Sequence, residues 1–293
     1  KVFTRCLAQS IDPDDFVHPM RHWMRHFEMI VDKTVDGILM ANTEMGPHMR
    51  IAMFDAALYV TGLPFDKDEV KKRVTEGMAV PNPLRNIAER EKRVVFSSRW
   101  DKEKQPWFYM DLIELFYERN PNHGIEFCVT TGAKGLRSTN QEYLDRAKKL
   151  EEEGKLKIYQ GLPKTTYYHL LANSQVQFNC ARQDWQSNTL NEASALGCYS
   201  LCPAFRSFPE ALNNNEMFLY APWSIEDAYN KLNLLLEEAS YGNTHQEVSY
   251  PADEMHKTID KTIDILFGNG EDYRYDLDAY THLRADGRYD YGG

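Results

Sequence analysis

The chain has 293 residues, of which 42% are hydrophobic and 27% charged, and its formal net charge is -10. These values are ordinary for a globular protein of one large or two medium domains, and they exclude a chain-wide basic surface for nucleic acid, although a local patch stays compatible with them. No apolar run approaches the roughly 20 residues of a membrane span. The five cysteines form no CxxC pair, so we expect reduced thiols in a cytoplasmic protein.

Short apolar runs alternate with longer amphipathic segments, which is typical of βα units around a mainly parallel sheet. The predicted strands are Val2–Cys6, Gly37–Ala41, Ala57–Thr61, Arg93–Phe96, Ile125–Thr130, Leu156–Tyr159, Val176–Cys180, Tyr199–Cys202 and Met217–Tyr220. The predicted helices are His22–Thr34, Lys67–Glu76, Trp107–Glu118, Gln141–Glu152, Thr165–Ala172, Thr189–Leu196, Phe208–Leu212, Ile225–Ala239 and Asp253–Leu266. The first residues already read as a strand and do not include an initial Met, so we expect residues upstream.

One segment, residues 79–93, is first broken by Pro and then densely charged, as interdomain linkers are. We therefore predict a partial N-terminal Rossmann-like domain with a hinge at 1–85 and a complete C-terminal Rossmann-like domain at 86–250. Residues 251–293 are predicted to form a helix and an acidic, Tyr-rich tail. The fold class is α/β.

The stretch SSRWDKEK follows the first strand of the predicted complete domain, where ligands bind in open α/β sheets. Arg99 and Lys104 lie five positions apart in this turn, so both can direct cationic groups at one diphosphate, with Ser98 beside them. A solvated basic turn would give the same pattern. After later strands, Gly132 and Gly161 allow a ligand to approach the backbone, or simply form turns.

The stretch DWQSNTLNEASALG places two acids, Asp184 and Glu192, around a polar loop and a helix start. Amide groups at such a helix start suit a phosphate or a sugar oxygen. The helix dipole alone also explains an acid in the first turn, such as Glu192. The candidate cap and loop residues are Ser187, Asn188 and Thr189.

Together these segments resemble the nucleotide-binding domain of retaining GT-B glycosyltransferases of the family 4-like group. VVFSSRWDKEK is similar to the strand and Arg-x4-Lys turn that open that domain, and DWQSNTLNEASALG is similar to its acid-x7-Glu element. KIYQGLP resembles the segment between them, and the resemblance covers roughly residues 36–239. It implies a GT-B fold of two Rossmann-like domains, with the N-terminal one incomplete in this chain.

The resemblance also implies roles. Arg99 and Lys104 match the pair that holds the donor diphosphate and stabilises the leaving nucleotide. Glu192 matches the acid that binds the ribose hydroxyls, and Asp184 stands where a Glu usually faces the transferred sugar. Ser98, Gly132, Gly161, Ser187, Asn188 and Thr189 then belong to the donor site.

Some positions depart from the pattern of this family. Asp184 is one methylene shorter than the usual Glu, Ser97 and Ser98 stand where Gly is frequent, and no glycine-rich N-terminal loop is found in the chain. His18 and His48 are available as acceptor-side residues, although an ordinary packed or surface histidine would give the same sequence pattern.

We therefore expect a glycosyltransferase that moves a sugar from a nucleotide-sugar, expected to be UDP-linked, with retention of configuration. No metal and no cofactor are expected, because carboxylates and cations can hold the donor. The acceptor stays open between a small molecule, a glycan and a protein, as does a homo-oligomer. Two alternatives are a phage-type DNA-base glycosyltransferase and a non-catalytic nucleotide-sugar-binding or assembly protein derived from such an enzyme.

Overall fold

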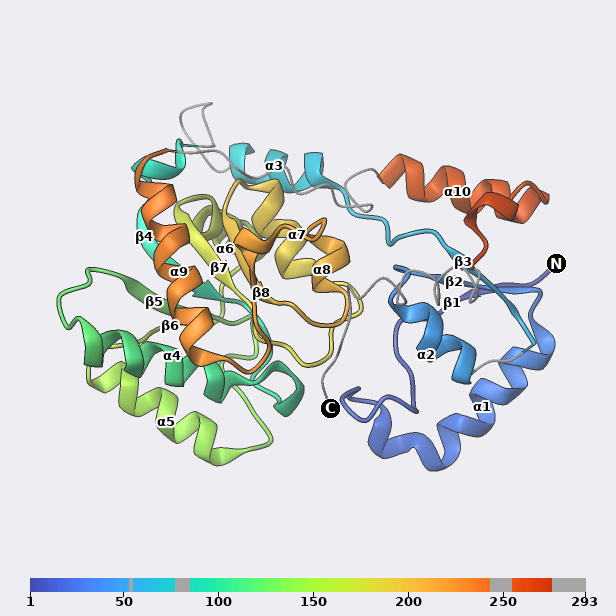
Figure 1. Cartoon of the computed structure of the whole chain (residues 1–293), viewed down its shortest axis with the longest axis horizontal. Helices are drawn as coiled ribbons and strands as arrows, with labels where there is room; N and C mark the ends of the chain where they lie inside the picture. The colour runs from blue at the N-terminus through green and yellow to red at the C-terminus, as the bar shows by residue number, and fades with distance from the viewer. Residues whose placement is uncertain (53–54, 77–84, 243–254, 276–293) are drawn as a thin grey trace. The chain divides into compact units, whose positions relative to one another are not determined.

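A computed structural model describes residues 1–52, 55–76, 85–242 and 255–275 (Figure 1). The chain divides into two compact units, which are described separately. Unit 1 comprises Lys1–Pro64 and Glu254–Gly293, and unit 2 comprises Phe65–Asp253.

The centre of unit 2 is a six-stranded parallel sheet in the order β6–β5–β4–β7–β8–β9. Its strands are β4 (Glu91–Phe96), β5 (Glu126–Thr130), β6 (Lys157–Tyr159), β7 (Ser174–Phe178), β8 (Tyr199–Pro203) and β9 (Leu219–Tyr220). The chain winds outward from β4 in one direction and from β7 in the other. The carboxyl ends of β4 and β7 therefore flank the switch point, where open α/β sheets bind ligands.

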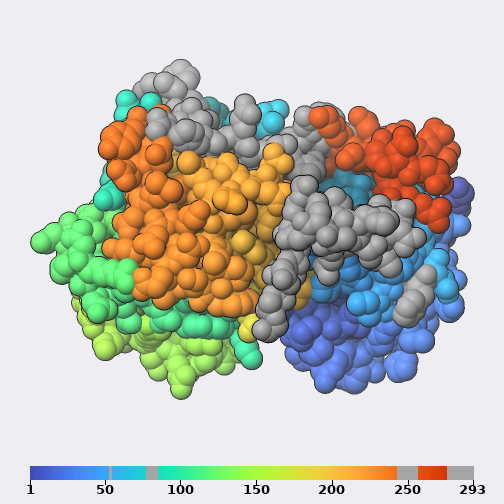
Figure 2. All heavy atoms as spheres, in the orientation of Figure 1, coloured from blue at the N-terminus to red at the C-terminus, as the bar shows by residue number. Residues whose placement is uncertain are grey.

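Helices cover both faces of this sheet. They are α3 (Lys67–Glu76), α4 (Pro106–Arg119), α5 (Gln141–Glu152), α6 (Lys164–Ala172), α7 (Asn188–Ala195), α8 (Phe208–Ala211) and α9 (Ile225–Ser240). Successive residues of β4 show the two layers, because Val94 and Phe96 pack in the core with α4 and α9, whereas Val95 packs in the core with α3, α6 and α7. Residues 200–242, amber to orange, form much of the face of unit 2 seen in Figure 2.

Unit 1 contains a three-stranded parallel sheet in the order β1–β2–β3. Its elements are β1 (Phe3–Arg5), α1 (Arg21–Thr34), β2 (Gly37–Met40), α2 (Met45–Ala52), β3 (Ala57–Val60) and α10 (Met255–Phe267). The buried carboxylate of Glu28 on α1 accepts hydrogen bonds from the amide (2.8 Å) and hydroxyl (2.6 Å) of Ser10, so it is satisfied within this unit. Near the end of the described chain, the Tyr275 amide donates to Leu58 of β3 at 2.8 Å.

The structure confirms the α/β fold class and each of the predicted strands, with small shifts at their ends. The predicted strand Met217–Tyr220 is shortened to β9 because a 3-10 helix, Glu216–Phe218, precedes it. Helix α2 was not predicted, since Gly46 and Pro47 interrupt its apolar pattern. Pro47 stands in the first turn, where no intrahelical hydrogen bond needs its missing amide proton.

The unit boundaries differ from those predicted from the sequence. Helix α3 was assigned to the N-terminal domain 1–85, but its Val70 and Val74 pack in the same cluster as residues of α6 and α7, so it belongs to unit 2. The described part of 251–293 belongs to unit 1. Of the predicted linker 79–93, residues 79–84 lie outside the described residues, and β4 already begins at Glu91.

A glycine, Gly197, forms the turn between α7 and β8, directly after the predicted helix Thr189–Leu196. Gly197 has a φ of +66°, a conformation that L side chains rarely adopt. The guanidinium of Arg90 lies 2.9 Å from the position that a Cβ would take, and it donates to the Leu196 carbonyl at 3.0 Å. This contact fixes the C-terminal end of the helix that carries Glu192.

Candidate functional site

The loops that follow β4 and β7 are joined at the switch point of the sheet. Lys104, at the end of a 3-10 helix (Lys102–Lys104), donates a 2.7 Å hydrogen bond to the Gln183 carbonyl. Its Nζ lies 3.2 Å from Asp184 Oδ2, and the side chains of Lys104 and Asp184 are 11% and 19% exposed. A backbone hydrogen bond from Arg182 to Glu103 (2.7 Å) ties the same loops together. Two predicted site residues from distant segments thus form one partly buried ion pair.

Arg99 stands on the first of these loops and is exposed. Its guanidinium lies 2.7 Å from Glu103 and 3.6 Å from Asp101, and both acids come from the same turn. The Arg99 side chain is 53% exposed, whereas those of Asp101 and Glu103 are 30% and 10% exposed, so solvent screens these pairs only from the Arg99 side. Arg99 is therefore a solvent-accessible cation that pairs with acids of its own loop.

Glu192 on α7 is buried with 6% exposure and is paired with a cation that was not predicted. Its Oε1 accepts a 2.5 Å hydrogen bond from Lys164 Nζ and a 3.3 Å hydrogen bond from the Tyr168 hydroxyl. Burial, followed by the charge of Glu192, raises the pKa of both Tyr167 and Tyr168, so both phenols are neutral and can donate. Glu192 is thus a buried hydrogen-bond acceptor surrounded by donors.

A cavity of about 160 Å³ opens beside this carboxylate. Its lining comes from the ends of β4 and β5 and from the starts of α6 and α7. The residues are Ser97, Thr130, Thr131, Gly132, Leu162, Lys164, Tyr167, Thr189 and Glu192. It places the predicted residues Gly132, Thr189 and Glu192 around one space.

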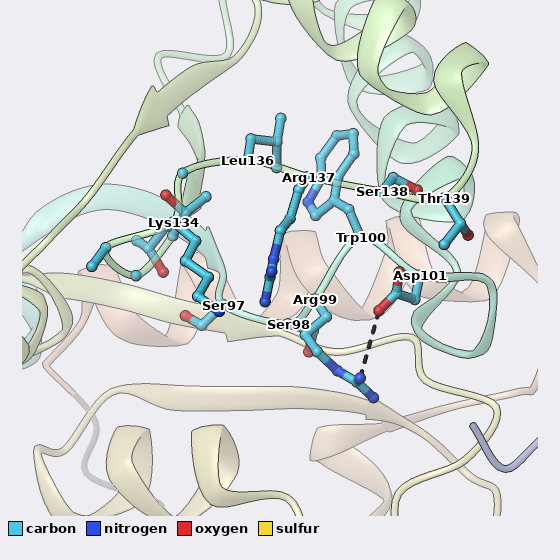
Figure 3. Close-up of a pocket in the computed structure, with 15 residues that line it drawn as sticks. Ser97, Ser98, Arg99, Trp100, Asp101, Lys134, Leu136, Arg137, Ser138 and Thr139 are labelled. Carbon is cyan, nitrogen blue, oxygen red and sulfur yellow. Dashed lines mark ion pairs between the residues drawn. The ribbon is translucent and has the colours of Figure 1, made fainter. Parts of the chain in front are cut away.

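A second cavity, of about 470 Å³, shares Ser97 and the segment Thr130–Gly132 with the first. It lies between the loop after β4, including Ser98 and Arg99, and the loop after β5, residues 131–139 (Figure 3). Lys134 and Arg137 extend from the second loop toward the first. The two cavities form a continuous lining at the carboxyl ends of β4 and β5.

The remaining predicted residues have different positions. Ser187 is buried as the N-cap of α7, where its hydroxyl accepts from the Leu190 amide at 3.3 Å. Asn188 is exposed in the first turn. Gly161 has a φ of +68°, which favours glycine, and its amide donates to Thr131 Oγ1 at 3.2 Å. Ser187 and Gly161 thus have local structural roles that explain them without a ligand.

Comparison with known proteins gives neither a matching family model nor a curated relative. Solved structures do match. A UDP-forming α,α-trehalose-phosphate synthase from Burkholderia vietnamiensis is 13% identical, with a TM-score of 0.64 over 92% of this chain and 66% of that one. Sucrose-phosphate synthase from Thermosynechococcus elongatus is 11% identical, with a TM-score of 0.60 over 89% and 62%. A mutant of S. aureus TarM, solved with UDP, is 11% identical, with a TM-score of 0.59 over 97% and 50%.

These three proteins are glycosyltransferases of the GT-B class. This chain has the GT-B fold. Identities of 11 to 13% establish the fold alone, and the chain spans between half and two thirds of the length of these three structures. The GT-B resemblance inferred from three short segments is thereby confirmed for the fold.

Within this GT-B fold, sequence reasoning missed several residues of the site. Lys164 pairs with Glu192, and Lys134, Arg137 and Tyr167 line the cavities. One signal could have identified Lys164, which directly follows a Pro at a helix start. A helix start that follows a parallel strand lies at the same edge of the sheet as the other site residues. In the loop TGAKGLRST only glycine was considered as a candidate site residue. Its two cations, Lys134 and Arg137, follow a strand just as Arg99 does.

The two histidines considered for the acceptor side lie in unit 1. His18 contacts the Ser10 carbonyl through Nδ1 at 2.8 Å, and His48 is half-buried on α2. The described residues contain no cluster of three or more His, Cys, Asp or Glu that could hold a metal ion. No described helix is long and apolar enough to cross a membrane.

All five cysteines are free, as predicted, and four of them are buried. Burial raises the pKa of Cys198 to about 12 and that of Cys6 to about 11. Neutral thiols of this kind are poor nucleophiles at neutral pH, so the cysteines do not compete with the switch-point residues as the candidate site.

Proposed function

We propose that the protein transfers a sugar from a nucleotide-sugar donor, with UDP as the expected nucleotide, to an acceptor. The observation that carries the proposal is the pairing of Lys104 with Asp184 across the switch point of a GT-B sheet. The neighbours named above support it, since one is described as UDP-forming and another was solved with UDP.

The chemistry of donor cleavage requires positive charge near the leaving group. The bond between the anomeric carbon and a phosphate oxygen breaks, and its electron pair leaves with the nucleoside diphosphate. Lys104 carries three N–H donors, of which Gln183 takes one and Asp184 faces another, so one remains for a phosphate oxygen. Arg99 adds a second, solvent-accessible cation on the same loop. Fixed charges of this kind stabilise developing negative charge.

The two carboxylates have different roles in this proposal. Asp184 holds the ammonium of Lys104 in place, so we assign it to positioning the cation as well as facing the sugar. Glu192 accepts hydrogen bonds from the ribose hydroxyls, which replace or share the contact with Lys164. The proposal includes retention of configuration, which the motif resemblance implies. It also includes independence of a metal, because the two cations can stabilise the leaving diphosphate.

The test is release of UDP from a panel of UDP-sugars by the full chain. We expect Lys104→Ala to lower the rate about 100-fold, as loss of one charged donor to a developing oxyanion does elsewhere. Glu192→Ala should weaken donor binding. Lys102→Ala and Glu152→Ala are matched controls on exposed sites and should leave the rate unchanged. Turnover by Lys104→Ala and Glu192→Ala equal to the parent would refute the assignment.

One observation favours a second candidate, a nucleotide-sugar binder without turnover. Lys104 is already engaged by a carbonyl and a carboxylate, and the shorter Asp184 points to it. A binder would titrate with UDP in a calorimeter but release no UDP from any donor. The same two measurements therefore separate the candidates.

A further inference from the structure

The larger cavity between the loops after β4 and β5 has a chemical character that the residues assigned above do not explain. Its volume of about 470 Å³ is in the range of small-ligand sites. The charged residues of its lining are Arg99, Lys134, Arg137 and Asp101, which gives three cations and one acid. In a chain with 44 acids against 34 Lys and Arg, this excess of cations is unusual.

Two of these cations, Lys134 and Arg137, have no counter-ion among the described residues. Neither Lys134 nor Arg137 makes a hydrogen bond or an ion pair with any residue in the described ranges. Nearby exposed cations do find acids, as Arg146 does with Asp111 at 2.5 Å and Glu114 at 2.6 Å. Lys134 and Arg137 instead extend side by side from one loop toward Ser97 and Ser98 (Figure 3). Their arrangement leaves two positive groups directed into one space.

An unsatisfied donor lies in the same wall. Trp100 is only 1% exposed and packs edge-on against Phe96, and its Nε1 has no hydrogen-bond acceptor among the described residues. An indole nitrogen can only donate, and buried donors are almost always paired. An acceptor-only ligand in the cavity would supply the missing partner, and oxyanions are such ligands.

We propose that this cavity binds a phosphate group, with Lys134 and Arg137 as its charge partners and Trp100 Nε1 as a buried donor. Arg gives a planar two-point contact and Lys a point charge, which together match a phosphate with several oxygens. The phosphate can belong to the diphosphate of a nucleotide or to a separate phosphorylated compound. The proposal stands on the cavity itself and does not require the transfer reaction.

The experiment is calorimetric titration of the full chain with inorganic phosphate at low ionic strength. The variant Lys134→Gln/Arg137→Gln removes both cations, and Lys148→Gln/Lys149→Gln removes the same charge from exposed positions of α5. We expect the first variant to weaken phosphate binding at least about tenfold, and the control to change it less than about twofold. Unchanged thermal unfolding of both variants ensures that they are folded.

Competition identifies the source of the phosphate. If UDP displaces inorganic phosphate, the cavity holds the nucleotide's diphosphate; if phosphate binds equally well to the UDP-saturated protein, the cavity serves a second ligand. Either result supports the site. No measurable phosphate binding by the parent, or equal binding by Lys134→Gln/Arg137→Gln and the parent, would overturn it. Because UDP binding through Lys104 and Glu192 is measured separately, this failure leaves the proposed function intact.

Discussion

Arg99 and Lys104 on the loop after β4, and Lys134 and Arg137 on the loop after β5, lie at the same edge of the sheet, but the two pairs differ in their partners. Arg99 and Lys104 are each paired with acids from their own loop or from the loop after β7. Lys134 and Arg137 have no such partner among the described residues and line a cavity with a buried unsatisfied donor. The first loop thus ties Lys104 into the fold and pairs the exposed Arg99 with its own acids, whereas the second loop leaves its two cations to solvent or a ligand.

This difference shows that a recognisable sequence motif and a charge available to a ligand are separate properties. The Arg-x4-Lys spacing is recognisable because it belongs to the architecture of the sheet. The cations of the second loop are recognisable only when their surroundings are known. If the pairing of each cation decides its contribution to stability, loss of the buried pair should cost more than loss of an exposed cation.

The largest effect is expected at Lys104. Lys104→Ala leaves Asp184 and the Gln183 carbonyl without a partner, and breaking such a pair in a buried place costs about 3–5 kcal/mol. Because both side chains are partly exposed, we expect about 2–3 kcal/mol, measured by urea unfolding. The double variant Lys104→Met/Asp184→Asn removes both charges and should recover a large part of the loss. Equal losses in the single and double variants would show that the ion pair is not the cause.

A smaller effect is expected at Lys164. Lys164→Met removes the closest donor of the buried Glu192, which costs about 1–2 kcal/mol as a lost charged hydrogen bond. Lys164→Arg keeps the charge and should restore most of the stability. The assignment of Lys164 as the partner of Glu192 fails if Lys164→Met unfolds at the same urea concentration as the parent.

The exposed cations should matter least for stability, whichever loop they occupy. Arg99→Gln breaks surface ion pairs and should cost less than about 1 kcal/mol. Lys134→Gln breaks none and should stay within about 0.5 kcal/mol of the parent. A loss above 2 kcal/mol for Lys134→Gln would mean that the second loop also fixes its charges, and the comparison would then fail.

The opposite end of β5 offers a titration that should leave the cavity unaffected. His123 precedes β5, and its Nδ1 accepts a hydrogen bond from the Ile125 amide at 2.9 Å. Burial, followed by the charge of Lys92, lowers the pKa of His123 below its usual 6.5. The unfolded chain then binds the proton more readily, so stability is full above about pH 6.5 and declines as the pH falls toward the folded pKa.

We expect the free energy of unfolding, read from urea midpoints, to fall between pH 7.5 and pH 5.5. His123→Asn keeps an acceptor for the Ile125 amide and should flatten the curve in this range. A parent curve that is already flat over this pH range would contradict the role given to His123.

The sequence predicted the sheet well, because buried parallel strands read as apolar runs and the motifs follow them at fixed spacing. It also predicted that Arg99 and Glu192 would reach one edge, which the switch-point topology requires. It could not predict that Lys164 faces Glu192, since this contact depends on the packing of α6 against α7. Nor could it separate Ser187, a buried cap, from Thr189, which lines a cavity, because cap residues and ligand-binding residues have the same polar types.

The central claim is that the switch-point site recognises a nucleoside diphosphate. Titration of the full chain with UDP and with uridine tests it most directly. Because the cations act only on the phosphates, we predict that UDP binds at least about tenfold more tightly than uridine, a difference of about 1.4 kcal/mol. Equal affinity for the two ligands, or no binding of either, would contradict the claim.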